Sequence, residues 1–276
     1  MPSIKVTILS KDSIEEFQTW LLGRGRNEKT VMAYGSDLRA FLKAVEEEKI
    51  QMEEYEELAS GWLNLTRAKA APKTTTRRLT SIKGFADWAG HSPVLQEYIA
   101  PKPGRPVPHP IPEGMAGGER MIEQCKNPEQ TALVGLCGYA GLRISEARLI
   151  VTENFNTHDM TLTVRGKGDR TRIIPLSNRA WCSLSSAFVH AMGRSDTRLI
   201  RYSDRAARKI ITNLSIRARL VRPVASHDLR ATFGTTAFYT TKDLRVVQEL
   251  LGHANSTQTE VYTGVSMDRM RDAVEF

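Results

Sequence analysis

The chain has 276 residues, enough for one large or two ordinary domains, and its apolar fraction of 41% is sufficient for packed cores. No stretch approaches the roughly 20 apolar residues of a membrane span, and the N-terminus lacks the apolar run of a signal peptide. The net charge of +8 and the pI near 9.5 are common in nucleic-acid-binding proteins, although solubility alone also accounts for a modest excess.

The three cysteines are Cys125, Cys137 and Cys182. Their odd number and wide separation give neither a disulfide framework nor the ligand spacing of a zinc site. We therefore expect a reducing, cytoplasmic environment and no bound metal, with each cysteine packed as a small apolar side chain.

The positive charge is unevenly distributed. Residues 1–100 carry 14 basic and 14 acidic side chains, whereas residues 101–276 carry 25 and 17. Acidic residues concentrate between Glu46 and Glu57, and basic residues run without an acid from Arg67 to Lys83. That basic run indicates either a solvated helix face or a face that follows a phosphate backbone, and charge alone leaves both open.

Residues 1–100 are predicted to form a domain of four amphipathic helices. Asp12-Ser13-Ile14-Glu15 fits a capping box for the first helix, and Thr74 is a candidate cap for the fourth. Apolar residues recur at helical spacing in every segment. The four stripes contain Phe17, Trp20 and Leu21; Val31, Tyr34, Leu38, Phe41, Leu42 and Val45; Leu58, Trp62 and Leu65; and Leu79, Ile82, Phe85 and Ala86.

Residues 101–113 are predicted to be a linker, because six prolines occur between Pro101 and Pro112. Proline at this density excludes helix and interior strand and favours an extended segment. The segment either lies along a phosphate backbone or only connects two domains.

Residues 114–276 are predicted to form a second, mostly helical domain with one β-hairpin. Residues 160–165 alternate as a strand, Gly166-Lys167-Gly168-Asp169 gives the turn, and residues 171–174 return. Further helices are expected near 177–192, 203–219, 227–238, 242–251, 256–262 and 266–273.

Six residues of this second domain form a chemically suggestive set: Arg143, Lys167, His227, Arg230, His253 and Tyr262. Attack on a phosphodiester without a metal requires fixed cations for the charge that develops at phosphorus, a nucleophile with a nearby base, and an acid for the leaving oxygen. Arginine suits the first role because its planar fork contacts two phosphate oxygens at once. Histidine suits proton acceptance because it titrates near neutral pH.

The motifs that carry these residues resemble the tyrosine recombinase family, which includes phage integrases and Xer-type recombinases. They are Gly141-Leu142-Arg143-Ile144-Ser145-Glu146, Gly166-Lys167-Gly168, His227-Asp228-Leu229-Arg230, Leu251-Gly252-His253, and Tyr262 nine positions later. Residues 27–38 are similar to a weaker pattern of the family's core-binding domain. The resemblance implies a mainly α fold, in which a four-helix, SAM-like core-binding domain precedes a catalytic domain with a small sheet or hairpin.

The resemblance also implies a role for each residue. Tyr262 attacks the scissile phosphate and forms a 3′-phosphotyrosine, with Arg143 and Arg230 on the non-bridging oxygens. Lys167 is the acid for the leaving 5′ oxygen, His227 the base for the tyrosine, and His253 a hydrogen-bond donor to the phosphate. Glu146 supports the site structurally. Neither a metal nor ATP nor any other cofactor is implied.

The implied partner is double-stranded DNA carrying a core-type recombination site, held between the two domains by a homotetramer, with a monomer in free solution and an accessory directionality factor left open. The basic residues of the fourth helix fall off its apolar stripe, which leaves them free to face DNA. The residues expected to bind DNA are Lys73, Arg77, Arg78, Lys83, Arg205, Arg208 and Lys209.

The helical pattern begins near residue 12, so we expect a short recombinase without an arm-binding domain. The favoured function is integration or excision of a phage or other mobile element. A Xer-like dimer resolvase, a DNA-binding relative without catalysis and a type IB-like topoisomerase are the alternatives. The segment after Tyr262 is expected to form a short helix that packs either on its own domain or on a neighbouring subunit.

Overall fold

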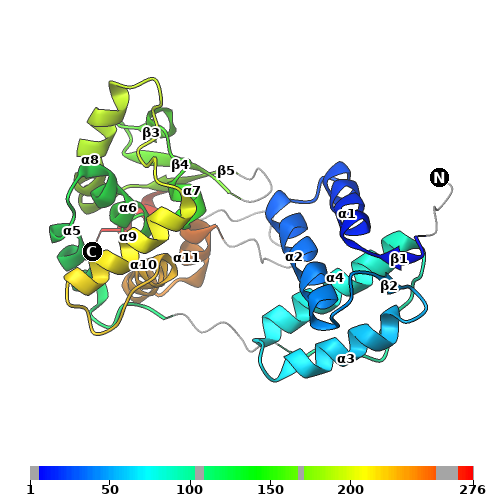
Figure 1. Ribbon diagram of the computed structural model, residues 1–276. Coiled ribbons are helices and arrows are strands. Elements are labelled where there is room, and N and C mark those ends of the chain that lie inside the picture. Colours follow the sequence, from blue (N-terminus) through cyan, green and yellow to red (C-terminus); the bar gives the residue numbers. More distant parts are fainter. Residues whose placement is uncertain (1–5, 103–108, 167–170, 253–266, 276) are drawn as a thin grey trace. The chain divides into compact units, whose positions relative to one another are not determined.

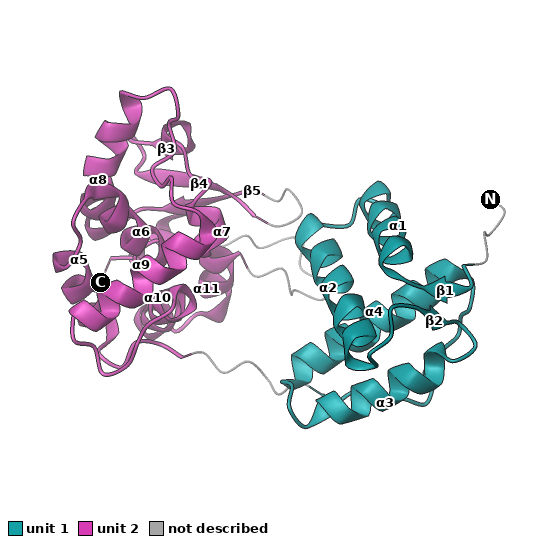
Figure 2. Ribbon diagram, viewed as in Figure 1, with its two compact units in different colours: residues 1–106 teal, residues 107–276 magenta. Residues whose placement is uncertain are grey.

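The structure is a computed structural model that describes residues 6–102, 109–166, 171–252 and 267–275 (Figure 1). The chain divides into two compact units, Met1–Pro106 and Val107–Phe276 (Figure 2). Each unit has its own apolar core. Within the described ranges, no helix is long and apolar enough to cross a membrane.

The first unit packs four helices around an aromatic core. Phe17, Phe41, Tyr55 and Phe85 are fully buried, and the Tyr55 hydroxyl donates a hydrogen bond to the carbonyl of Ile82 at 3.0 Å. Two short strands that the sequence pattern did not predict pair in an antiparallel sheet. The elements are β1 (Ile8–Leu9), α1 (Lys11–Gly23), α2 (Glu28–Ala44), β2 (Ile50–Gln51), α3 (Tyr55–Arg67) and α4 (Pro72–Ala89).

Two helix starts differ from the prediction. The capping box of α1 is built by Ser10 and Ser13, so Asp12 lies inside the helix. Helix α4 begins at Pro72, two residues before Thr74, because proline at the first helical position needs no hydrogen-bond donor and already has helical φ.

Two predicted core positions are also wrong. Leu65 is 78% exposed, because α3 turns Tyr55, Ala59 and Trp62 toward the core instead. Cys182 is exposed on the outer side of its helix. Cys137 is fully buried, as expected.

The second unit surrounds one buried helix, α6, in which every residue from Ala132 to Gly138 is buried. A three-stranded antiparallel sheet of order β3-β4-β5 contains the predicted hairpin and one further short strand. The helices are α5 (Gly114–Glu123), α6 (Pro128–Gly138), α7 (Ile144–Ala147), α8 (Asn178–Met192), α9 (Asp204–Arg217), α10 (Ser226–Thr241), α11 (Leu244–Leu251) and α12 (Met267–Asp272). The strands are β3 (Phe155–Asn156), β4 (Thr161–Arg165) and β5 (Thr171–Pro175), after a 3-10 turn, η1 (Thr152–Asn154).

The C-terminal helix α12 lies against its own unit. Met270, Ala273 and Val274 are buried in the core of the second unit, and Arg271 donates a hydrogen bond to the carbonyl of Asp159 at 3.1 Å. Residues 270–274 therefore pack within their own unit. The expected helix at 256–262 and the hairpin tip lie outside the described residues.

Candidate functional site

The first arginine of the expected site is set by a sharp turn after α6. Gly141 has φ +66°, a conformation that glycine adopts without strain, and Arg143 then becomes the residue that caps α7. Glu146, three residues into the same turn, accepts hydrogen bonds from the backbone N–H of Arg143 at 2.9 Å and from its Nη1 at 2.8 Å. The three-residue spacing thus lets Glu146 bind both the backbone and the side chain of Arg143.

Glu146 binds not one arginine but three. Arg172 donates from Nη2 and Nη1 to the two carboxylate oxygens at 3.0 and 3.3 Å, and Nη1 of Arg230 lies 3.7 Å from Oε2. The Glu146 side chain is 5% exposed, while Arg230, Arg172 and Arg143 are 7%, 14% and 36% exposed. Three guanidinium groups around one carboxylate leave an excess of two positive charges at a largely water-excluded position.

The pKa values follow from this arrangement. Burial by itself would raise the pKa of Glu146, but hydrogen bonds from Arg172 and from the Arg143 backbone outweigh it, so the pKa lies below the ordinary value. Burial, together with the charge of Arg143, lowers the pKa of Arg230 to about 10. Both groups therefore remain charged at neutral pH.

Arg230 holds two chain turns together. Its Nη1 donates to the carbonyl of Gly141 and its Nη2 to the carbonyl of Leu251, both at 2.5 Å. The Gly141 carbonyl lies in the turn after α6 and the Leu251 carbonyl at the end of α11. At both places no helical N–H is available to donate to the carbonyl. The second expected arginine is thus placed beside the first, with part of its hydrogen-bonding capacity used by the backbone.

His227 occupies the first turn of α10, one helical turn before Arg230. Its side chain is exposed, but partial desolvation and the charges of Arg230, Arg208 and Arg143 lower its pKa. A lowered pKa leaves the imidazole neutral at pH 7, the form that accepts a proton.

The structure thus brings together Arg143, His227 and Arg230. Lys167, His253 and Tyr262 lie outside the described residues. The residue that the sequence reasoning missed is Arg172 on β5. Strand alternation places it on the same face as the buried Ile174, whereas Ile173 on the other face is 51% exposed. An arginine on the same strand face as buried apolar residues was the sequence pattern that could have indicated a buried ion pair at this position.

The basic residues of α4 are less free than expected. Arg77 forms an ion pair with the buried Asp37 of α2 and donates to the carbonyl of Ala33 at 3.2 Å. Arg78 stacks its guanidinium over the Trp62 ring at 5.0 Å. Each of these two side chains is thus held by a neighbouring helix, and their assignment to DNA binding stays a prediction. Lys73 is exposed at the start of α4, and Lys83 is half-buried.

In the second unit, Arg205, Arg208 and Lys209 are exposed on α9. Arg208 also pairs with Asp204 one turn earlier, at 2.8 Å. An exposed ion pair of this kind contributes little to stability, so Arg208 can exchange that partner for a phosphate at small cost.

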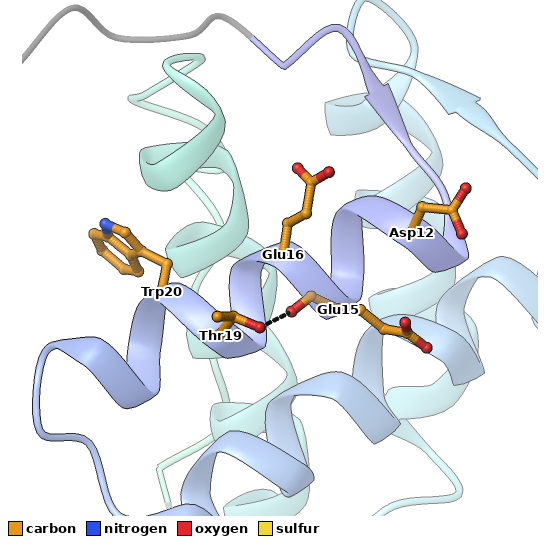
Figure 3. A pocket seen from close by; sticks show the side chains of 5 residues that line it. All are labelled: Asp12, Glu15, Glu16, Thr19 and Trp20. Carbon is orange, nitrogen blue, oxygen red and sulfur yellow. Dashed lines mark hydrogen bonds between the residues drawn. The ribbon is translucent and has the colours of Figure 1, made fainter.

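A surface hollow on α1 is negatively charged, in contrast to the basic faces of α4 and α9 (Figure 3). It is lined by Asp12, Glu15, Glu16, Thr19 and Trp20. The three carboxylates would repel a phosphate backbone. This hollow contains none of the expected site residues.

The Glu146 cluster is suited to bind an anion at the exposed edge of Arg143. Cations fixed before a reaction stabilise developing negative charge without a reorganisation cost. Among the described residues, no group of three or more His, Cys, Asp or Glu side chains is arranged to hold a metal ion.

Comparison with known proteins gives two family matches. The profile described as "Phage integrase family" matches residues 118–269, and the profile described as "Phage integrase, N-terminal SAM-like domain" matches residues 14–92. Together they cover most of both units.

Curated relatives are similar over nearly the whole chain. Tyrosine recombinase XerD of Mycobacterium tuberculosis is 28% identical, with 90% of this chain and 91% of the relative covered. Tyrosine recombinase XerC of Chromobacterium violaceum is 25% identical, covering 94% and 92%.

Solved structures share the fold. The integrase from mycobacterium phage Brujita has a TM-score of 0.51 at 24% identity, covering 96% of this chain and 92% of that one. A lambda integrase dimer bound to a COC′ core site has a TM-score of 0.70 at 16% identity, covering 91% and 76%. The expected fold, mainly helical with a SAM-like first domain, is confirmed.

Proposed function

This chain belongs to the phage integrase family and is a site-specific DNA recombinase of the tyrosine type, and we propose on that premise that Tyr262 cleaves DNA by forming a 3′-phosphotyrosine. In this reaction the Tyr262 oxygen forms a bond to phosphorus while the bond from phosphorus to the 5′ oxygen breaks. His227 accepts the phenol proton and Lys167 donates one to the leaving oxygen. A 5′ hydroxyl of the partner strand then reverses the step, so the bond energy is conserved without ATP.

The observation that best supports this proposal is the arginine cluster on Glu146. Arg143 and Arg230 come from motifs 87 residues apart in the sequence, and both bind the same buried carboxylate. A pentavalent phosphorane carries more negative charge on its non-bridging oxygens than the ground-state diester, and two fixed guanidinium groups favour the former. His253 adds a hydrogen bond to the same oxygens.

We assign duplex DNA contacts to both units. Lys73 and Lys83 in the first, and Arg205, Arg208 and Lys209 in the second, would bind phosphates and contribute the salt-dependent part of the affinity. Arg77 and Arg78 would have to leave Asp37 and Trp62 to take part, which makes them weaker candidates.

The biological role we propose is integration and excision of a phage or other mobile element, in the cytoplasm of a bacterial host. A solved structural neighbour is a lambda integrase tetramer bound to a Holliday junction, which supports a homotetramer on DNA for this chain as well. A separate accessory factor would then set the direction of the reaction.

A Xer-like dimer resolvase is the second candidate, and one observation favours it. The relatives named XerD and XerC are matched over 91% and 92% of their own lengths, with 90% and 94% of this chain covered. The two roles differ in substrate: integration joins two unlike DNA elements, whereas resolution acts on two copies of one site.

Covalent capture tests the proposal. The protein is expressed in its native host, denatured, and purified with any DNA that remains attached, which is then sequenced. Tyr262→Phe serves as the control. We expect discrete DNA ends at one or two sites, and these ends should disappear in Tyr262→Phe. Two unlike sites would indicate integration, and a single site would indicate resolution. Scattered ends would indicate a topoisomerase-like activity, and tight binding without an adduct would contradict the cleavage mechanism.

A further inference from the structure

Arg172 makes an unusual set of contacts for a residue on a hairpin strand. Its two terminal nitrogens bind both oxygens of Glu146, and its Nε donates to the carbonyl of Leu250 at 3.3 Å. The side chain is 14% exposed. One guanidinium thereby joins three separate elements: β5, the α7 turn and the C-terminus of α11.

The same guanidinium packs on the residue that ends α11. Gly252 has φ +61°, and a Cβ at this position would lie 2.8 Å from Nη1 of Arg172 and 3.0 Å from its Cδ. Only glycine meets both requirements without strain or displacement of the arginine. The end of α11 and the arginine side chain are therefore fitted to each other.

Arg172 also determines how Glu146 is oriented. The Glu146 oxygen Oε1 is shared between Arg143 and Arg172, and Oε2 between the Arg143 backbone, Arg172 and the more distant Arg230. A bidentate arginine–carboxylate pair fixes the carboxylate plane, which a single hydrogen bond does not. Without Arg172, the carboxylate would keep hydrogen bonds to Arg143 alone, from its backbone N–H and its Nη1, and would lose the bidentate pair that holds its plane relative to β5 and α11.

We propose that Arg172 is a positioning residue for strand cleavage: it holds Glu146 in the orientation that aims Arg143 and Arg230 at the scissile phosphate, and it ties the end of α11 to the same carboxylate. The inference rests on the proposed function, because it assumes that these two arginines bind that phosphate. Arg172 itself acts through Glu146 and does not contact the DNA.

The test compares three variants on a nicked duplex carrying the core sequence recovered by covalent capture. Arg172→Ala removes the contacts, and Arg172→Lys keeps the charge without the bidentate geometry. Arg194→Ala is the matched control, since Arg194 likewise binds one carboxylate, Glu129 at 3.4 Å, and one late helix carbonyl, His190 at 2.9 Å, in the same unit. Should Arg172→Ala not fold, Arg172→Met, which preserves the packed stem on Gly252, replaces it.

The expected result separates catalysis from binding. Arg172→Ala should slow single-turnover cleavage at saturating DNA about 10- to 100-fold, the loss typical of small misplacement of catalytic groups. The Kd for DNA should stay within about threefold, because the phosphate-binding residues outside the cluster are unchanged. Arg172→Lys should recover part of the rate, and Arg194→Ala should cleave like the unaltered protein.

A double-mutant cycle with Glu146→Gln distinguishes positioning from general loss of structure. If Arg172 acts through Glu146, Arg172→Ala should slow the Glu146→Gln protein less than about threefold. The same slowing in both backgrounds would overturn the inference, as would a normal cleavage rate in Arg172→Ala or a loss confined to DNA affinity. If the unaltered protein forms no adduct on the captured site, the proposed function itself fails.

Discussion

Replacing Glu146 with glutamine is the most informative single perturbation of this structure. Glutamine has nearly the same shape but no charge, and its amide NH₂ presents donors to arginines that are themselves only donors. Arg143, Arg172 and Arg230 would then repel one another without a shared counter-charge. Because Glu146 is 5% exposed, solvent can replace only a small part of the lost interaction.

The expected loss of stability is about 3 kcal/mol. Breaking a buried ion pair by removing one partner costs roughly 3 to 5 kcal/mol. We expect the lower end, because glutamine still accepts one hydrogen bond and water reaches Arg143, which is 36% exposed. A loss of about 3 kcal/mol raises the unfolded fraction of the second unit roughly 100-fold.

The cysteines provide an assay that is specific to the second unit. All three occur after residue 124, and Cys137 is fully buried on α6. With Cys125 and Cys182 replaced by serine, the rate of thiol labelling reports the opening of this unit alone. Glu146→Gln should raise that rate about 100-fold at pH 8. The matched control is Glu129→Gln, where the carboxylate also binds two arginines, Arg194 and Arg201, but nearer the surface. It should cost about 1 kcal/mol or less.

The pH dependence gives an independent check on the same carboxylate. The pKa of Glu146 is lower in the folded protein than its ordinary value of 4.5, so the unfolded chain binds more protons in the acidic range. Its stabilising contribution is therefore complete above about pH 4.5 and is lost as the pH falls through the folded pKa. Hydrogen exchange of α6 should show this slope in the unaltered protein and a shallower one in Glu146→Gln. A labelling rate no higher than that of Glu129→Gln, with an unchanged pH slope, would refute the reasoning.

Three further predictions concern Arg143, Arg208 and Gly252. Arg143→Ala should slow single-turnover cleavage about 100- to 1,000-fold by removing one preorganised donor to the transition state, while DNA affinity measured by gel shift should change little. Undiminished cleavage would contradict the binding of the scissile phosphate by Arg143. Arg208→Gln should raise the pKa of His227, because the Arg208 charge helps to lower it, and so move the acidic limb of the pH–rate profile at subsaturating DNA to higher pH. An unmoved limb would contradict the role of His227 as base. Gly252→Ala should destabilise α11 by about 1 to 2 kcal/mol, because alanine is strained at φ +61° and collides with Arg172; unaltered hydrogen exchange of α11 would exclude this.

The four helices of the first unit could be predicted from the sequence because their apolar residues recur at the helical period. Helices α5, α6 and α7 were not predicted individually, and α6 has no apolar stripe because every residue from Ala132 to Gly138 is buried. Helix starts were less predictable. Ser10 and Asp12 are both good capping residues, and only the extended backbone at Ser10 shows which one caps α1. Likewise, Thr74 is a plausible cap, but Pro72 begins the helix two residues earlier. Local composition offers several acceptable starts, and the tertiary packing selects among them.

The short strands β1, β2 and β3 have two residues each and leave no measurable alternation in the sequence. They exist because neighbouring elements bring the chain segments together. Strand pairing between Ile8–Leu9 and Ile50–Gln51 joins segments separated by about 40 residues, which no local pattern reports.

The arginines and histidine of the site were predictable because their motifs are local and resemble those of a known family. The contacts among them were not. Glu146 binds Arg172 as well as Arg143 because β5 returns beside α7. This is a tertiary contact, which neither local segment of the sequence indicates. The same holds for Arg77, whose partner Asp37 lies 40 positions earlier in the sequence.

The most direct test of the central claim is to identify the amino acid that becomes joined to DNA. The denatured adduct is digested with protease and nuclease, and mass spectrometry locates the nucleotide on the peptide. The account predicts a 3′-phosphate ester on Tyr262 and a free 5′ hydroxyl on the other fragment. Attachment to any other residue, or to a 5′ phosphate, would contradict it.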